Sequence, residues 1–284
     1  MACYHPWIPK GGHASGRPLS CGQCFGCRLE HSRQWAMRCV HESKLWPVNS
    51  FVSLTYRDAR WSLNPEDFTG FMKRLRYYYP QTIRYYMSGE YGETSRRPHY
   101  HALLFNLDFP DAKYYRTTGQ GFKLYTSESL ERIWGFGFAP FGAVTFESAA
   151  YVARYVMKKL TGARARELDC LDPDTGEMYP IVPEYSRMSR GSGSGGHGGI
   201  GAGFVKKFRN DIYPHGKVVI NGVEVMPPRY YDRMQKWYSW GDHAAMKLRR
   251  GEAVCASVED NFPHRLDAKR AVARARLERL KRTV

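Results

Sequence analysis

The middle of the chain has the clearest pattern of hydrophobic and polar positions. Residues 51–56 alternate apolar with small polar side chains, which is typical of a half-buried strand. Further apolar segments predict strands at 83–91, 99–105 and 143–146. The polar stretch at 92–98 lies between two of these segments and predicts a hairpin loop. We therefore expect a sheet to form the core of this region.

Helices are predicted between and after these strands. The first has Asn64 as its cap and Pro65 in first position, where an amide side chain can accept a free N–H and the missing N–H of proline is not needed. Its apolar residues recur at helical spacing, at Phe68, Phe71, Met72 and Leu75. A short helix is predicted over 126–135, and another runs from a cap at Ser148 to about Leu160. The order β-α-β-β-α-β plus a helix predicts an α+β fold: a ferredoxin-like (split βαβ) antiparallel sheet with helices on one face.

The flanking regions differ in composition from this middle region. Residues 1–45 form a Cys-rich N-terminal segment, 46–162 the α+β domain, and 163–284 a polar, loop-rich extension. The extension contains a glycine tract at 191–203, which has no Walker lysine and is interpreted as a linker or a DNA-tracking loop. It ends in a basic helix that either docks on the core or contacts phosphates or a partner.

The charge balance narrows the class of partner. The 284 residues include 43 Lys and Arg against 27 Asp and Glu, a formal net charge of +16. Such an excess favours a polyanionic partner, because phosphate neutralisation supplies much of the affinity for DNA and RNA. Aromatic residues make up 14% and are interleaved with the basic ones, so they can stack on bases. We favour nucleic acid over a solubilising charge or a membrane-surface role.

The hydropathy pattern indicates a cytosolic location. No window approaches the ~20 apolar residues of a membrane-spanning helix, and residues 1–10 contain two prolines and no apolar stretch of a secretory signal. Disulfides are rare in the cytosol, so the seven cysteines are expected to be free thiols or metal ligands.

A pair of histidines is the strongest chemical signal. His99 and His101 flank Tyr100 on a predicted strand, so both imidazoles project from one face. Such a pair is more often structural than functional, but here a carboxylate is available. A hairpin loop centred near 93–94 puts Glu90 opposite His99, and Glu93 is the alternative third ligand. Two imidazoles and a carboxylate suit Mg²⁺ or Mn²⁺ acting on a phosphate.

A pair of tyrosines is the second signal. Tyr151 and Tyr155 are four residues apart on a predicted helix and so share a face, with Lys158 one turn later and Lys159 beside it. Tyrosines at this spacing are usually packing residues. A nearby lysine favours a chemical role, because a cation stabilises a phenolate and a charged phosphorane. A tyrosine that attacks a phosphodiester leaves a 3′-hydroxyl and a 5′-phosphotyrosine.

The N-terminal cysteines suggest a second metal. Cys21, Cys24 and Cys27 have C-x-x-C-x-x-C spacing and supply three thiolates, whereas a zinc site needs a fourth ligand. The candidates for that ligand are Cys3, His5, His31, Cys39 and His41. Structural Zn²⁺ and reduced free thiols are both open interpretations.

Together these motifs resemble the HUH endonuclease superfamily, which combines His-hydrophobic-His on a strand with Tyr-x-x-x-Tyr on a helix. Histidines before tyrosines resemble its replication-initiator branch rather than the relaxases. The wording is similar to the replication initiators of microviruses, especially the gokushovirus branch. The similar segments are Cys21–Arg28, Phe51–Tyr56, Gly89–Gly92, Arg97–His101 and Tyr151–Lys159.

The resemblance implies a rolling-circle replication initiator. Such an enzyme holds Mg²⁺ or Mn²⁺ with Glu90, His99 and His101, nicks the origin with Tyr151 or Tyr155, and steadies the phosphate with Lys158 or Lys159. The implied partners are single-stranded DNA at a phage origin, supercoiled replicative-form DNA, and the host helicase and polymerase, in the cytoplasm of a bacterial host. The alternatives are an HUH enzyme of a plasmid or transposon and a non-catalytic DNA- or RNA-binding protein.

Overall fold

A computed structural model describes residues 3–7, 19–58, 60–92, 94–158, 169–171, 176–191, 198–256 and 258–279. The chain divides into two compact units. The sheet unit comprises Trp35–Lys206, and the terminal unit comprises Met1–Gln34 together with Lys207–Val284. The predicted metal-binding histidines lie in the sheet unit, and the Cys-x-x-Cys-x-x-Cys run lies in the terminal unit.

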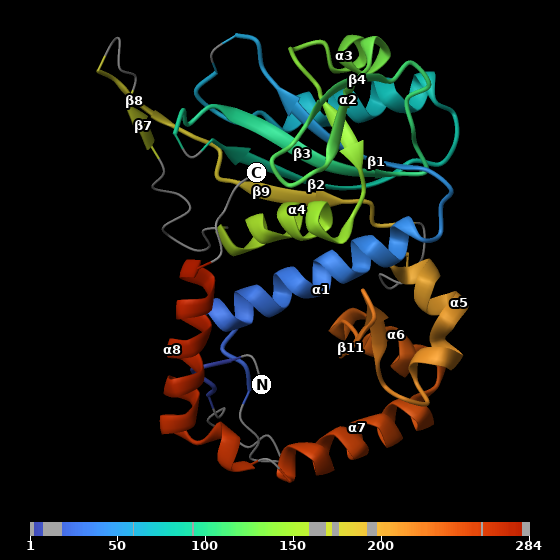
Figure 1. Ribbon diagram of the computed structural model, residues 1–284, viewed down its shortest axis with the longest axis vertical. Helices are drawn as coiled ribbons and strands as arrows, with labels where there is room; N and C mark the ends of the chain where they lie inside the picture. Colours follow the sequence, from blue (N-terminus) through green and yellow to red (C-terminus); the bar gives the residue numbers. More distant parts are fainter. Residues whose placement is uncertain are drawn as a thin grey trace. The chain divides into compact units, whose positions relative to one another are not determined.

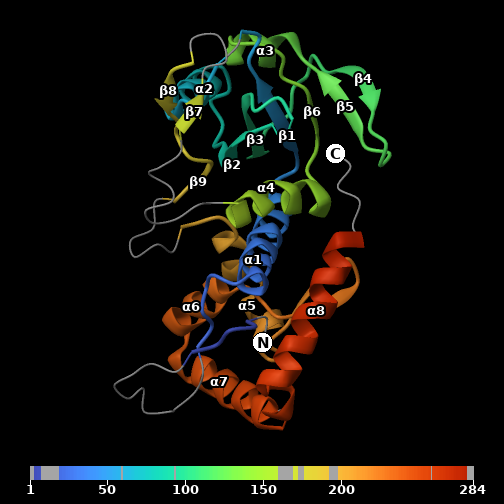
Figure 2. The same cartoon turned by 90° about the vertical axis from the view of Figure 1, so that its left-hand side faces the viewer.

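The sheet unit is built on a seven-stranded antiparallel sheet of order β4-β5-β6-β1-β3-β2-β9 (Figure 1). The strands are β1 (Asn49–Thr55), β2 (Arg84–Tyr91), β3 (Pro98–Phe105), β4 (Lys113–Thr117), β5 (Lys123–Thr126), β6 (Phe141–Ala143) and β9 (Tyr185–Met188). The α+β class and the antiparallel sheet are as predicted. The central order β6-β1-β3-β2 is compatible with the split βαβ arrangement. Figure 2 shows the β4–β5 hairpin, which the sequence pattern does not predict, at one edge of the sheet.

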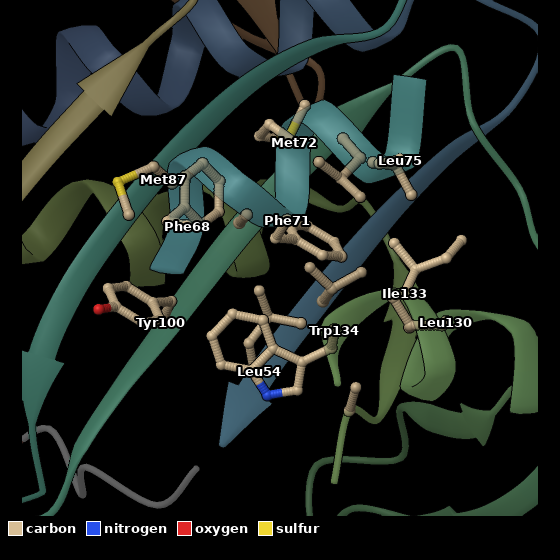
Figure 3. Close-up of a cluster of buried hydrophobic side chains, with 14 of the residues drawn as sticks. Leu54, Phe68, Phe71, Met72, Leu75, Met87, Tyr100, Leu130, Ile133 and Trp134 are labelled. Atoms are coloured by element: carbon tan, nitrogen blue, oxygen red, sulfur yellow. The ribbon is translucent and has the colours of Figure 1, made fainter. Parts of the chain in front are cut away.

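One face of the sheet is covered by α2 (Pro65–Tyr78) and α3 (Glu128–Trp134). The side chain of Asn64 accepts the N–H of Glu66, so the predicted cap of α2 is confirmed. The apolar face of α2 packs with Leu54, Tyr100 and Trp134 in a fully buried cluster (Figure 3). Each large side chain buried there contributes about 1.5–3 kcal/mol relative to exposure in water. This core holds β3 rigid behind its two histidines.

The opposite face carries α4 (Phe146–Lys158) and the part of α1 (Phe25–Ser43) that belongs to the sheet unit. Val152 of α4 packs with Leu103 and Phe105 of β3 in this second cluster. The prediction of helices on one face is therefore correct for α2 and α3 and wrong for α4. Strand residues such as Leu103 are apolar on both faces, because both faces of the sheet are covered.

The start of α4 differs from the prediction. The hydroxyl of Thr145 accepts the N–H of Ser148, and the hydroxyl of Ser148 accepts the N–H of Thr145. This reciprocal pair resembles a capping box, with Thr145 rather than Ser148 as the cap. The strand predicted at 143–146 is accordingly displaced to β6, which ends at Ala143.

The extension after residue 163 contains more regular structure than its polar composition predicts. It holds α5 (Ala202–Ile212), α6 (Arg229–Tyr238), α7 (Trp240–Cys255), the predicted basic C-terminal helix α8 (Pro263–Arg279) and a 3-10 turn (Val258–Asn261). It also holds the short hairpins β7 (Asp169–Leu171) with β8 (Met178–Pro180) and β10 (Val218–Ile220) with β11 (Val223–Val225). The expectation of a loop-rich region is therefore wrong.

The glycine tract is only partly described, since residues 192–197 lie outside the described residues. Its second half is built into the sheet unit. Ile200 is fully buried, its carbonyl accepts from the Arg38 side chain, and the Gly201 N–H donates to Glu42. The interpretation of the whole tract as a linker or DNA-tracking loop is thus wrong for residues 198–203.

Hydropathy along the helices was compared with the requirements of a bilayer. None of the described helices is both long enough and apolar enough to span a membrane.

Candidate active site

The β2–β3 hairpin brings a carboxylate and two imidazoles together. Glu90 of β2 and His99 of β3 are directly paired across the hairpin, so the predicted register is confirmed. His101 lies two residues further along β3 and therefore projects from the same face. The alternative ligand Glu93 lies outside the described residues.

The Glu90 carboxylate faces both imidazole rings. Its Oε1 lies 3.4 Å from Nε2 of His101, and its Oε2 lies 3.9 Å from Nε2 of His99. One ligand atom from each of the three residues lies within 4.8 Å of the other two. Glu90 is only 1% exposed. A carboxylate so deeply buried requires partners of opposite charge or strong hydrogen bonds, because burial removes its hydration.

Each imidazole is oriented through its other nitrogen. Nδ1 of His99 lies 3.1 Å from the carbonyl oxygen of Arg97, and Nδ1 of His101 lies 2.9 Å from Oγ of Ser53 on β1. A carbonyl only accepts, so Nδ1 of His99 carries the proton and its Nε2 has a lone pair directed at Glu90. Contacts of this kind fix the tautomer and the ring plane of metal-binding histidines.

The protonation state of His101 also suits a metal ligand. Burial, together with the neighbouring charge of His99, lowers the pKa of the His101 imidazole well below its usual value. The ring is therefore neutral near pH 7 and offers a lone pair.

The donor set fits a hard divalent cation. Adjacent ligands of an octahedral Mg²⁺ or Mn²⁺ ion lie roughly 3 Å apart. The observed separations of 3.4 Å and 3.9 Å are slightly wider, so small rotations of side chains would suffice to close the site. Two imidazoles and one carboxylate leave coordination positions open for a substrate oxygen and water.

Tyr151 of α4 lies beside this cluster. Its hydroxyl oxygen is 3.4 Å from Nε2 of His101, and the two rings meet edge to face with centroids 5.0 Å apart. Phe51 of β1 stacks on His101 with centroids 5.5 Å apart and touches the Tyr151 ring at 6.3 Å. The Arg154 guanidinium lies 5.6 Å from the centroid of the Tyr151 ring. A phenol, a cation and the candidate metal ligands thus share one surface.

The remaining predicted site residues are described less fully. The backbone of Tyr155 and Lys158 belongs to α4, but their side chains lie outside the described residues, as does the whole of Lys159. Sequence reasoning missed the contacts that Ser53 and Phe51 make with His101. Both are in a strand that was predicted, but only the β1–β3 pairing, in which Ser53 is the partner of His101, places them at the histidine.

The structure also groups four of the cysteines. One sulfur from each of Cys3, Cys21, Cys24 and Cys27 lies within 4.8 Å of the others. Among the candidates for a fourth ligand, Cys3 is therefore the one at the cluster. Cys39 is buried elsewhere, in the sheet unit, and His41 stacks there on Phe204.

Comparison with known proteins gives a consistent result. Residues 49–160 match the family model of the replication-associated protein ORF2. The chain is 35% identical to "Replication-associated protein VP4" of Bdellovibrio phage phiMH2K, over 82% of this chain and 73% of the relative. It is 34% identical to "Replication-associated protein ORF2" of Spiroplasma virus 4, over 79% and 69%. It is 28% identical to "Replication-associated protein ORF4" of Chlamydia phage 1, over 78% and 55%. No solved structure is significantly similar to it.

Proposed function

The chain belongs to the family of replication-associated proteins of small phages, and we propose that it initiates rolling-circle replication as a tyrosine nickase and ligase. The observation that carries this proposal is the approach of the Tyr151 hydroxyl to the Glu90, His99 and His101 cluster. A nucleophile beside a candidate divalent-cation site is the arrangement that cleavage of a phosphodiester requires. A protein that only binds DNA would have no need of it.

In the proposed reaction the Tyr151 hydroxyl oxygen attacks the phosphorus of the scissile phosphodiester. The bond from phosphorus to the 3′-oxygen breaks, and the phenol proton ends on that oxygen as a free 3′-hydroxyl. The 5′ side of the strand stays attached as a phosphotyrosine ester. No water is consumed, so the same residues can run the step backwards and rejoin a strand.

Glu90, His99 and His101 would hold Mg²⁺ or Mn²⁺ next to the tyrosine. The bound cation would supply Lewis-acid polarisation of the phosphate and neutralise charge in the transition state. Ser53 and the Arg97 carbonyl would keep the imidazoles aimed at it. Arg154 is placed to stabilise negative charge that develops on the Tyr151 phenol.

Tyr155 would act as the second nucleophile. It follows Tyr151 by one turn of α4, so the two phenols can alternate at a single metal site. The first tyrosine would hold the 5′ end while a polymerase extends the 3′-hydroxyl, and the second would cut the regenerated junction. Lys158 or Lys159 would steady the phosphate during these steps.

The proposed partners follow from this reaction and from the charge. Single-stranded DNA at a phage origin is the substrate, within supercoiled replicative-form DNA, and the net charge of +16 favours binding it. A helicase and a polymerase of the bacterial host would unwind and extend the strand in the host cytoplasm.

A gel assay tests the proposed activity without knowledge of the origin. The full chain is incubated with Mn²⁺ or Mg²⁺ and a library of random single strands labelled at the 3′ end, and products are resolved in SDS. We expect an SDS-resistant adduct whose DNA, once sequenced, begins at one common site. The adduct should require the cation and vanish in the double variant Tyr151→Phe with Tyr155→Phe.

Tyr77→Phe is the matched control, because Tyr77 is an exposed tyrosine of α2. An adduct that survives the double Tyr151 and Tyr155 substitution would overturn the proposed nucleophiles. The absence of any adduct with either cation, from folded protein that binds the library, would overturn the nickase assignment itself.

A further inference from the structure

We propose that Cys3, Cys21, Cys24 and Cys27 form a structural tetrathiolate zinc site that anchors the N-terminal segment to the C-terminal helices of the terminal unit. The four sulfurs lie within 4.8 Å of one another. Sγ of Cys21 lies 3.9 Å from Sγ of Cys27. Sulfurs around a tetrahedral zinc with Zn–S bonds of about 2.3 Å are roughly 3.8 Å apart. A disulfide needs a distance of about 2.05 Å, so the spacing fits a shared ion rather than a bridge.

The local backbone shapes the cluster for thiolates. The N–H of Cys24 donates to Sγ of Cys21, and the N–H of Cys21 donates to Sγ of Cys3, both at 3.3 Å. Hydrogen bonds from N–H groups stabilise the negative charge that metal-bound sulfur carries. Gly22 makes the turn between two of the ligands with a φ of 75°, a conformation that favours glycine.

Cys3 reaches the cluster through two contacts of its own segment. Trp7 and Leu19 form an antiparallel bridge with backbone hydrogen bonds of 3.0 Å and 2.8 Å. The ring of Tyr4 stacks on Phe25, the first residue of α1, with centroids 4.8 Å apart. These contacts bring the chain end next to Cys21 and explain how a cysteine distant in sequence completes the set.

The segment around the cluster has little apolar burial to stabilise it. Cys3 is 1% exposed, but Trp7 is 51% and Leu19 is 40% exposed. Segments too small for a hydrophobic core are commonly held by a metal or a disulfide. Four thiolates and no open position are the donor set of structural zinc. This set differs in softness from the Glu90, His99 and His101 cluster, so the two sites would select different ions.

The residues beside these cysteines bind the C-terminal part of the terminal unit. The Arg229 guanidinium, at the start of α6, donates to Oγ of Ser20 at 3.3 Å. The Arg270 guanidinium of α8 lies 3.2 Å from Nε2 of His5. Ser20 adjoins the ligand Cys21, and His5 lies two residues from the ligand Cys3, so an ion there would set the positions from which α6 and α8 are held.

Metal content and thiol counting test the site on the full chain. We expect one zinc per chain by elemental analysis of protein purified without chelator, and four additional thiols reactive toward a disulfide reagent once a chelator removes it. Cobalt substituted for zinc should give the charge-transfer absorption of cobalt thiolates. Iron in place of zinc, or no bound metal, would overturn the zinc assignment.

Single substitutions locate the ligands. Cys3→Ser and Cys24→Ser should weaken zinc binding by roughly tenfold or more, whereas Cys255→Ser should not, because Cys255 is exposed and lies outside the cluster. Unchanged binding in Cys3→Ser would exclude the tetrathiolate site. In the wild-type chain, zinc removal should also speed hydrogen exchange in α6 and α8. Unchanged exchange there would overturn the anchoring role while leaving the ligand set to the other measurements.

Discussion

The Tyr151 hydroxyl and Nε2 of His101 lie 3.4 Å apart, although the two residues are 50 positions apart in the chain. The contact exists because α4 and β3 pack through Val152 and Leu103 in one buried cluster. Packing density in such a cluster restrains both backbones. The candidate nucleophile is therefore held at the candidate metal ligands by the hydrophobic core, not by a mobile loop.

Substitution of the buried carboxylate should stop cleavage and spare folding. Glu90→Gln keeps the volume of the side chain but removes the charge that a divalent cation needs. We expect covalent adduct formation to fall by roughly 100-fold or more, since even residues that only support metal ligands change affinity or activity 10- to 100-fold. Single-strand binding and the far-ultraviolet circular dichroism should be unchanged.

The control for this prediction is Glu128→Gln, at an exposed glutamate of α3 whose side chain pairs with Lys113. It should retain full activity. Full activity in Glu90→Gln would show that Glu90 is not a ligand, and loss of folding would indicate a structural role for the carboxylate.

Ser53 should act as a positioning residue. Ser53→Ala removes the hydroxyl that lies 2.9 Å from Nδ1 of His101. We expect the Mn²⁺ concentration for half-maximal cleavage to rise about 10- to 100-fold, with the rate at saturating Mn²⁺ reduced much less. Ser53→Thr restores a hydroxyl on a strand-favouring residue and should recover most of the affinity. An alanine variant with an unaltered Mn²⁺ dependence would contradict this role.

Tyr100, between the two histidines, should matter for stability and not for chemistry. Its side chain projects to the opposite face, where its hydroxyl donates to the carbonyl of Asn64 at 2.7 Å and accepts the N–H of Asn64 at 3.0 Å. Tyr100→Phe leaves both backbone groups without this partner in a buried site. We expect the free energy of unfolding to fall by about 1–3 kcal/mol in urea titrations.

Cleavage by Tyr100→Phe, measured well below its unfolding midpoint, should match the wild type. A variant as stable as the wild type would show that the hydroxyl contributes nothing to the fold. A stable variant that has lost cleavage would place Tyr100 in the chemistry instead.

Features set by neighbouring residues could be predicted from the sequence. The cap of α2 depends on Asn64 and the next few positions, and the pairing of Glu90 with His99 depends on the short loop between them. Both signals are local, so no knowledge of the rest of the chain is needed. The hairpin also determines which faces the histidines share, which is why the ligand set was accessible.

Features set by packing could not be predicted in the same way. β4 is exposed at every position and carries no burial alternation, and β9 joins the sheet only because its edge pairs with β2. The start of α4 turns on a choice between two hydroxyl residues, Thr145 and Ser148, that both suit a cap. The choice of Cys3 as the fourth cysteine depends on the bridge between Trp7 and Leu19, which spacing alone does not reveal.

The most direct measurement identifies the tyrosine that carries DNA. Trypsin cleaves after Arg132, Arg154 and Lys158, so Tyr151 falls in peptide 133–154 and Tyr155 in peptide 155–158. The covalent adduct is trimmed with nuclease, digested with trypsin and analysed by mass spectrometry. We expect nucleotide mass on peptide 133–154 after a single round of cleavage, and on peptide 155–158 in the Tyr151→Phe variant. Nucleotide mass on neither peptide, or on 155–158 alone in the wild-type chain, would contradict attack by Tyr151.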